Sequence, residues 1–158
     1  MESLDVIFEQ ATAGIGQWSS RELGVASARL WQEFAASYGD YDARYFDGPM
    51  PETPPLYVTS TVIWDSRART EDLRPDGSYK RGGVPLPLEG HSLMGAGQDV
   101  ELLAPVRDGD VLTLRETIDS VERKAGKSGQ FLLLTVMREY VNQRGTAVFR
   151  ARESLIVK

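Results

Sequence analysis

The spacing of apolar residues predicts two helices near the start of the chain. In the first segment four apolar residues recur at helical spacing: Leu4, Ile7, Phe8 and Ala11. Two glycines follow this pattern, so residues 3–13 are expected to form a short amphipathic helix. The second helix is expected over 27–38, with Ser27 available as its cap and Gly39 as its stop. Its apolar face comprises Leu30, Trp31, Phe34, Ala35 and Tyr38. Residues 17–25, between the helices, fit a first strand.

The last third of the chain predicts an antiparallel meander. Three long strand-like segments, separated by the turn sequences KAGKSGQ and QRG, cover 111–121, 131–142 and 146–157. In the first of them Leu112, Leu114 and Ile118 alternate with polar residues, as in a half-buried strand. The middle segment is apolar on both faces over 131–137, which fits either a central strand or an interface with another chain. A further strand is expected over 96–103, closed by the turn PVRDGD.

The middle of the chain carries weaker signals. Residues 39–55, GDYDARYFDGPMPETPP, are dense in Gly, Pro and Asp and are expected to form a loop at the end of the second helix. Residues 56–64, LYVTSTVIW, weakly favour a strand, although Pro54 and Pro55 after Thr53 also fit a helix start. Residues 65–90 are polar and too long for an ordinary connection, so we expect a functional lid or a mobile surface excursion. With the meander, these elements predict an α+β fold.

Composition and charge narrow the possible chemistry. A chain of 158 residues can bury one sizeable core, so a single domain over 1–158 is expected. The absence of cysteine removes disulfides, thiolate nucleophiles and cysteine-based metal centres, and the single histidine, His91, is too few for a multi-histidine metal site. The formal charge of −5 opposes binding to nucleic acid. We therefore expect no metal and no nucleic acid partner.

The sequence also predicts no membrane association. Its start, MESLDVIFEQATAGIG, lacks the basic region of a signal peptide. The longest apolar stretch, 131–137, falls far short of the ~20 residues that a spanning helix needs. A cytoplasmic location is the resulting expectation.

The order of the elements resembles the hot-dog fold, in which a curved sheet wraps around one central helix. Residues 34–47, FAASYGDYDARYFD, resemble the signature FAxxxGDxNPxHxD of MaoC-like enoyl-CoA hydratases and dehydratases. Further on, PVRDGDVL is similar to the family's PxRxGDxL turn and YVNQRG to its YxNQxG hairpin. With GGVPLPLEGHSLMGAGQ, the match is closest to the amino-terminal type of MaoC domain, similar to the fungal fatty acid synthase dehydratase. It covers nearly the whole chain after Gly16 and implies that 55–64 form the central helix, against their β-branched composition.

The resemblance implies a reaction, and one position departs from it. In the family, the Asp and His of the signature activate a water that adds to the double bond of an enoyl-CoA, while backbone amides polarise the thioester carbonyl. On this chain Gly39 and Asp40 match, Asp42 and Ala43 replace the Asn and the Pro, and Tyr45 stands where the catalytic His is expected. A tyrosine, with a reference pKa near ~10, is protonated at pH 7 and does not replace imidazole as a base. The resemblance therefore implies a degenerate module.

Three residues are the catalytic candidates: Asp40, Tyr45 and His91. Asp40 follows a helix-ending glycine, where an aspartate commonly binds its own backbone, so it either keeps the family's catalytic geometry or only orients the loop. Tyr45 is interpreted as a packing or hydrogen-bonding residue rather than an acid. His91 lies outside the family's histidine position, and it either takes part in proton transfer near the sheet edge or has a structural role.

Three further residues are candidates for substrate binding: Gly95, Gly97 and Arg81. The glycines allow the carbonyl of a ligand to approach the backbone, and a β-bulge explains them equally well. Arg81 belongs to a basic group within 65–90 that suits the phosphates of coenzyme A, and solvated surface charge is the alternative.

Three functions remain open from the sequence. The first is a subunit of a heteromeric MaoC-like enoyl-CoA hydratase, a lyase of fatty acid or steroid side-chain metabolism, whose hot-dog partner carries the intact Asp/His pair. The second is a self-sufficient homodimeric hydratase or thioesterase that uses Asp40. The third is a non-catalytic acyl-CoA binding module. In each case coenzyme A enters as part of the acyl-CoA thioester, and no separate cofactor is implied.

Overall fold

The computed structural model describes residues 3–61, 69–73, 84, 86, 88, 90–127 and 129–158. The helices are α1 (Leu4–Gly14), α2 (Ala28–Ser37), the one-turn segments α3 (Ala43–Phe46) and α4 (Tyr57–Ser60), and the 3₁₀ turn η1 (Thr70–Asp72). The strands are β1 (Ser19–Val25), β2 (Leu93–Leu102), β3 (Val111–Gly126), β4 (Gly129–Val141) and β5 (Ala147–Val157).

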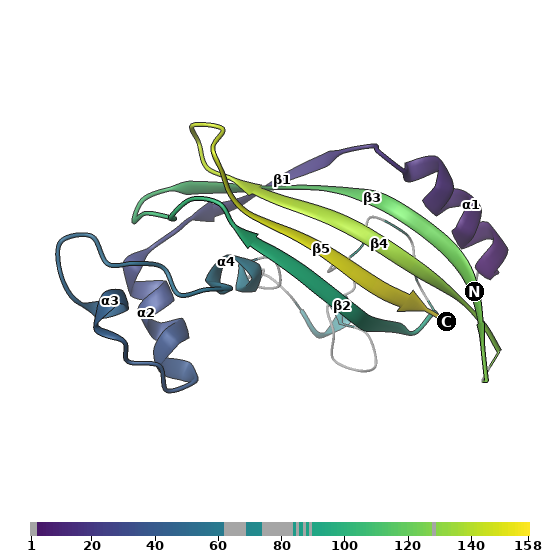
Figure 1. Cartoon of the computed structure of the whole chain (residues 1–158), viewed down its shortest axis with the longest axis horizontal. Helices are drawn as coiled ribbons and strands as arrows, with labels where there is room; N and C mark the ends of the chain where they lie inside the picture. Colours follow the sequence, from purple (N-terminus) through teal and green to yellow (C-terminus); the bar gives the residue numbers. More distant parts are fainter. Residues whose placement is uncertain are drawn as a thin grey trace.

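The strands form one antiparallel sheet in the order β1-β3-β4-β5-β2. Consecutive strands β3, β4 and β5 are neighbours, which confirms the predicted meander, while β1 and β2 form the two edges. Figure 1 shows α2, α3 and α4 gathered near one end of the curved sheet and α1 near the other. The predicted α+β class is confirmed.

The element boundaries agree with the sequence for the long helices and differ at one hairpin. The helices expected over 3–13 and 27–38 are α1 and α2. The pairing of β3 with β4 continues as far as Gly126 and Gly129, so most of the segment KAGKSGQ is strand rather than turn. Gly129, with a φ of 111°, adopts a conformation at this reversal that side chains other than glycine disfavour.

The segment assigned to a central helix by resemblance is helical where it is described. Helix α4 spans Tyr57–Ser60 in spite of its β-branched content, and residues 62–64 lie outside the described part of the chain. The cap position is Leu56, which has a left-handed φ of 68°, rather than Thr53. The Thr53 hydroxyl instead donates a hydrogen bond to the Val106 carbonyl at 2.8 Å.

The core lies on the inner face of the sheet in two clusters. Along β4 the even-numbered residues share this face, because successive side chains alternate. The cluster under α2 and α4 includes Trp31, Tyr57, Leu114, Tyr140 and Phe149. The cluster under α1 includes Ile7, Ala11, Ile118, Leu134, Val136 and Val157. Leu88, from the end of the 65–90 excursion, is buried in this second cluster, so that part of the excursion belongs to the core.

A buried arginine separates the two clusters. Arg138 of β4 forms ion pairs with Glu116 of β3, at 3.2 Å, and with Glu153 of β5. Gln98 of β2 donates a hydrogen bond to the same Glu153 at 2.9 Å. Because a buried charge is tolerated only when it is paired, this row of polar side chains joins four strands across the inner face.

The turn 106–110 anchors the start of α2. The carboxylate of Asp108 accepts the Ala28 N–H at 2.8 Å and so caps the helix. The sequence predicted this role for Ser27, which occupies the cap position but makes no capping hydrogen bond with its side chain. The cap comes from a residue 80 positions away because the Ala26 N–H bonds the Asp110 carbonyl at 2.7 Å and thereby holds the turn beside the helix.

The same turn is tied to the β4–β5 hairpin by Asp110. This carboxylate is only 2% exposed and accepts hydrogen bonds from the Arg107 N–H at 2.9 Å, the Gln143 amide at 3.2 Å and the Arg144 guanidinium at 3.1 Å. The PVRDGD and YVNQRG motifs therefore meet at one buried carboxylate.

Replacing Asp110 tests this connection. Asp110→Ala is expected to lower the free energy of unfolding by about 2–4 kcal/mol, because it leaves three donors without their charged acceptor. The control Asp47→Ala, at an exposed carboxylate, is expected to change it by less than about 0.5 kcal/mol. Urea denaturation followed by circular dichroism measures both variants. Equal midpoints for them would contradict the role of Asp110.

Candidate functional site

The candidate site begins where α2 ends. Gly39 has a φ of 80°, and its N–H donates to the Ala36 carbonyl at 3.1 Å. The Asp40 N–H donates to the Ala35 carbonyl at 3.0 Å. This pair of bonds is the glycine-dependent Schellman ending of a helix. The glycine of the signature thus fixes where Asp40 leaves the helix.

Asp40 and Asp42 shape the loop that follows. The Oδ1 atom of half-buried Asp40 accepts the Asp42 N–H at 3.1 Å, which is the backbone contact that one sequence interpretation gave it. Asp42 in turn caps α3, since its Oδ1 accepts the Arg44 N–H at 3.0 Å and its Oδ2 accepts the Arg44 guanidinium at 2.8 Å. These hydrogen bonds hold the pKa of the Asp42 carboxyl below its usual value. Asp42 therefore acts as a helix cap in place of the expected Asn.

Tyr45 is enclosed beside this loop. It is 5% exposed, and its carbonyl accepts a hydrogen bond from the Gln32 amide at 3.0 Å. The Arg44 guanidinium lies over its ring at 5.7 Å. Burial first, and then the nearby Asp40 and Tyr45, raise the pKa of the Tyr38 phenol. The loop thus places Asp40 and Tyr45 near Tyr38, which the sequence predicted only as part of the apolar face of the second helix.

His91 lies elsewhere in the chain. It precedes β2, where Ser92 exchanges backbone hydrogen bonds with Lys158 at the end of β5. The ten residues of β2, at about 3.3 Å each, span about 30 Å, and α4 lies near the opposite end of that strand (Figure 1). Within one chain, His91 is therefore not brought to Asp40 and Tyr45.

The candidate substrate-binding residues are also separate from the loop. Gly95 and Gly97 flank a register shift in the pairing of β2 with β5, which is the β-bulge that the sequence offered as their alternative explanation. A side chain built at either glycine would meet no atom within 4 Å. Arg81 lies outside the described residues.

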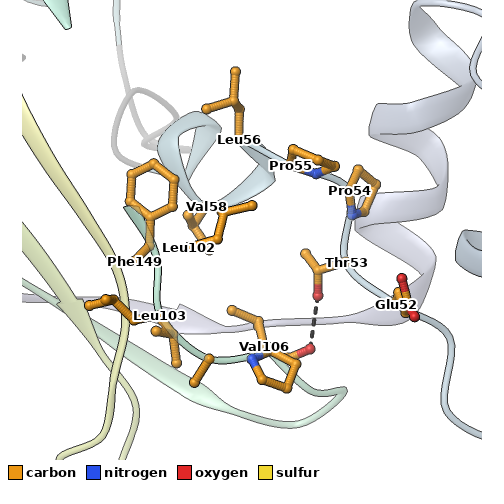
Figure 2. Close-up of a pocket in the computed structure, with 13 residues that line it drawn as sticks. Glu52, Thr53, Pro54, Pro55, Leu56, Val58, Leu102, Leu103, Val106 and Phe149 are labelled. Carbon is orange, nitrogen blue, oxygen red and sulfur yellow. Dashed lines mark hydrogen bonds between the residues drawn. The ribbon is translucent and has the colours of Figure 1, made fainter. Parts of the chain in front are cut away.

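A cavity of about 330 Å³ lies next to α4. Its walls are two segments of the chain, 52–56 with Val58 and 102–106, together with Val148 and Phe149 (Figure 2). Most of these side chains are aliphatic, and the Thr53 hydroxyl is occupied by its bond to Val106. A volume and lining of this kind suit an apolar chain. No local sequence pattern predicts the cavity, because its walls come from separate stretches of the chain that only the fold places face to face.

The cavity and the signature loop are joined by Glu52. Its N–H donates to the Arg44 carbonyl at 2.7 Å, and its carboxylate lies 3.8 Å from the Arg44 guanidinium. Leu56, whose backbone has a left-handed conformation, lines the same cavity. Figure 2 shows Leu56 at the top of the view, with Val58 below it. A bulky residue in this conformation is held there by its surroundings. The shape of the cavity is thus coupled to the loop that carries Asp40 and Tyr45.

The described residues form neither a metal cluster nor a membrane-spanning helix. Within the described residues, no group of three or more His, Asp or Glu side chains is arranged to hold a metal ion. In the same part of the chain, every helix is too short or too polar to cross a membrane.

Comparisons with known proteins identify the fold. Structures similar to this chain include the MaoC-like dehydratase from Rhodospirillum rubrum, at 20% identity and a TM-score of 0.64, covering 90% of this chain and 91% of that one. The ChsH1–ChsH2 complex from Mycobacterium tuberculosis has 12% identity and a TM-score of 0.69, with 97% and 89% covered. The truncated HadBC (3R-hydroxyacyl-ACP dehydratase) complex from the same organism has 16% identity and a TM-score of 0.61, with 90% and 96% covered.

These structural likenesses establish the hot-dog fold that the sequence predicted. A search among curated proteins gives no match. The model of the family described as "FAS1-like, dehydratase domain region" matches residues 13–151. The chain therefore belongs to this FAS1-like dehydratase family and has the hot-dog fold.

Proposed function

We propose that the chain is the degenerate subunit of a heteromeric MaoC-like enoyl-CoA hydratase. In this proposal it forms part of the acyl pocket, and a second hot-dog subunit supplies the intact Asp/His pair. The reaction is the reversible addition of water to a trans-2-enoyl-CoA, in which the water oxygen bonds the β-carbon and a proton reaches the α-carbon. Coenzyme A is part of the substrate, and the chain itself holds no cofactor.

The observation that carries the proposal is the environment of Tyr45. This residue stands at the histidine position of the signature, is buried, and lies under Arg44. The only imidazole of the chain, His91, is near the far end of β2. General acid–base catalysis requires the proton acceptor within hydrogen-bond reach of the reacting water. The loop of this chain lacks that imidazole, so a second subunit has to provide it.

Two further observations support the proposal. The apolar cavity beside α4 is suited to an acyl chain and is connected to the signature loop through Glu52. Two of the similar structures, ChsH1–ChsH2 and HadBC, are complexes of two named components.

Mixing experiments test the subunit role. The purified chain alone is expected to leave crotonyl-CoA and longer enoyl-CoAs unchanged. Addition of a hot-dog module with an intact GDxNPxH signature is expected to raise hydration by about 100-fold or more, since a positioned acid–base pair contributes on the order of 10²–10⁴. Loss of the conjugated thioester absorbance measures the rate, and the same module without its histidine is the control. Turnover by the chain alone would contradict the proposal.

Paired variants of Asp40 separate a structural from a catalytic role. In the active mixture, Asp40→Asn is expected to keep the rate within about threefold, because the amide oxygen still accepts the Asp42 N–H. Asp40→Ala is expected to lower the free energy of unfolding by about 1 kcal/mol through loss of that bond. If Asp40 were the general base, Asp40→Asn would instead reduce kcat by on the order of 10²-fold or more. Enzyme kinetics and thermal unfolding of both variants decide between the two roles.

Filling the cavity tests its assignment to the acyl chain. Leu103→Trp, in the cavity wall, is expected to raise KM for long-chain enoyl-CoAs by about tenfold and to leave crotonyl-CoA unaffected, because added side-chain volume removes space only from the longer chain. Leu30→Trp, at an exposed position on α2, is the matched control. An equal effect on short and long substrates would argue against an acyl-binding cavity.

A further inference from the structure

One edge of the sheet has no neighbouring strand along its whole length within the described residues. Strand β2 pairs with β5 on one side, and among the described strands none pairs with its other side. Nine of its ten residues, all except Leu93, are exposed. An open edge of this length presents unpaired backbone N–H and C=O groups to any strand that can add to it.

The outer face of the sheet carries a row of alternating charges that ends at this edge. Arg115 of β3 pairs with Glu139 of β4 at 3.4 Å, and Glu139 pairs with Arg150 of β5 at 3.0 Å. Arg150 then pairs with Glu101 of β2 at 3.1 Å. These four residues are direct cross-strand neighbours, so the row crosses four strands in register. It ends on Glu101, whose one cationic partner among the described residues, Arg150, is shared with Glu139.

A second carboxylate on the same face of β2, Asp99, forms no ion pair with the cations that the structure describes. Asp99 lies opposite Arg152 of β5, but Arg152 directs its guanidinium to Asp119 at 2.8 Å. No ion pair forms at Asp99 within the described residues. The sequence of β2, LMGAGQDVEL, contains no Lys or Arg. The outer side of the edge is therefore acidic.

The inner side of the same edge is apolar near α4. Val100 and Leu102 alternate with the two acids, and they are 42% and 65% exposed. Leu102 also lines the cavity. A strand added at this edge would therefore cover apolar side chains on one face and meet carboxylates on the other.

A second copy of the chain is a poor match for this edge. If β2 paired antiparallel with the β2 strand of a second copy about a two-fold axis, Asp99 and Glu101 of both copies would lie at the same interface. Neither strand would contribute a basic residue there. Axes centred on Asp99, Val100 or Glu101 place acid directly against acid, an arrangement that destabilises strand pairs. A strand with basic outer side chains would continue the alternation of the row.

We propose that β2 selects a non-identical partner strand that carries Lys or Arg on its outer face and apolar side chains on its inner face. The inference rests on the proposed function in that this partner is the second hot-dog subunit. Beyond the proposed function, the inference specifies the positive charge on the partner strand, which distinguishes that partner from a second copy of this chain. Opposite charges across the strand interface favour pairing of β2 with the basic partner strand, and like charges disfavour pairing of β2 with itself.

A charge-swapped copy of the chain serves as the probe. The variant with both Asp99→Lys and Glu101→Lys, labelled to shift its mass, is mixed with the wild-type chain, and dimers are counted by native mass spectrometry. Mixed dimers are expected to exceed their statistical share by about threefold or more, since each favourable cross-strand charge pair stabilises the interface between the two β2 strands. The excess is expected to fall as salt is raised. Asp99→Lys alone, which breaks none of the ion pairs among the described residues, is expected to show a smaller excess. It also controls for misfolding of the double variant.

The matched control changes the same charge elsewhere. Glu22→Lys on the opposite edge strand β1, combined with Asp47→Lys, is expected to give no excess of mixed dimers. Equal excess in the two mixtures, strong self-association of the wild-type chain, or no dimers with either probe would overturn the proposal. Because no substrate is used, these results are independent of the hydration assay: selective pairing without hydration would reject only the proposed function.

Discussion

A single buried carboxylate, Asp110, connects the parts of the chain on which the candidate site depends. It draws Gln143 and Arg144 of the β4–β5 hairpin onto the turn 106–110. The same turn caps α2 through Asp108 and forms a wall of the cavity through Val106. Because two of its three donors come from the distant β4–β5 hairpin, the position of the turn that caps α2, and with it the loop that carries Asp40, depends on this one charge being paired.

The polar residues of the signature loop are largely committed to holding its shape. Gly39 ends α2, Asp40 binds the backbone of Asp42, and Asp42 caps α3. In the proposed function this explains how a module without the histidine keeps the local geometry of the family. The loop remains a scaffold for the cavity, to which Glu52 connects it, even though its acid–base pair is incomplete.

The two faces of the sheet use charge in different ways. On the inner face, Arg138 is buried between Glu116 and Glu153, and its charge is balanced within the chain. On the outer face the row of charges runs to the edge strand β2 and ends on Glu101, beside Asp99, which forms no ion pair in the described part of the chain. The first arrangement stabilises one chain, whereas the second, in our proposal, is completed only by a partner. Specificity of assembly would then reside in the edge strand, away from the loop that resembles a catalytic signature.

The sequence by itself determined the two long helices, the meander and the family. Helical spacing located α1 and α2, alternation located the meander, and the signature from Phe34 to Asp47 identified the family, because these signals are local and repeat with the period of each element. The composition of residues 56–64, LYVTSTVIW, did not predict the helix α4, since these residues favour a strand unless tertiary contacts override their propensity. Only the tertiary structure decided that Asp108 rather than Ser27 caps α2, that His91 lies apart from Asp40, and that two apolar stretches enclose a cavity. Each of these depends on residues distant in the chain becoming neighbours, and local patterns carry no information about such pairs.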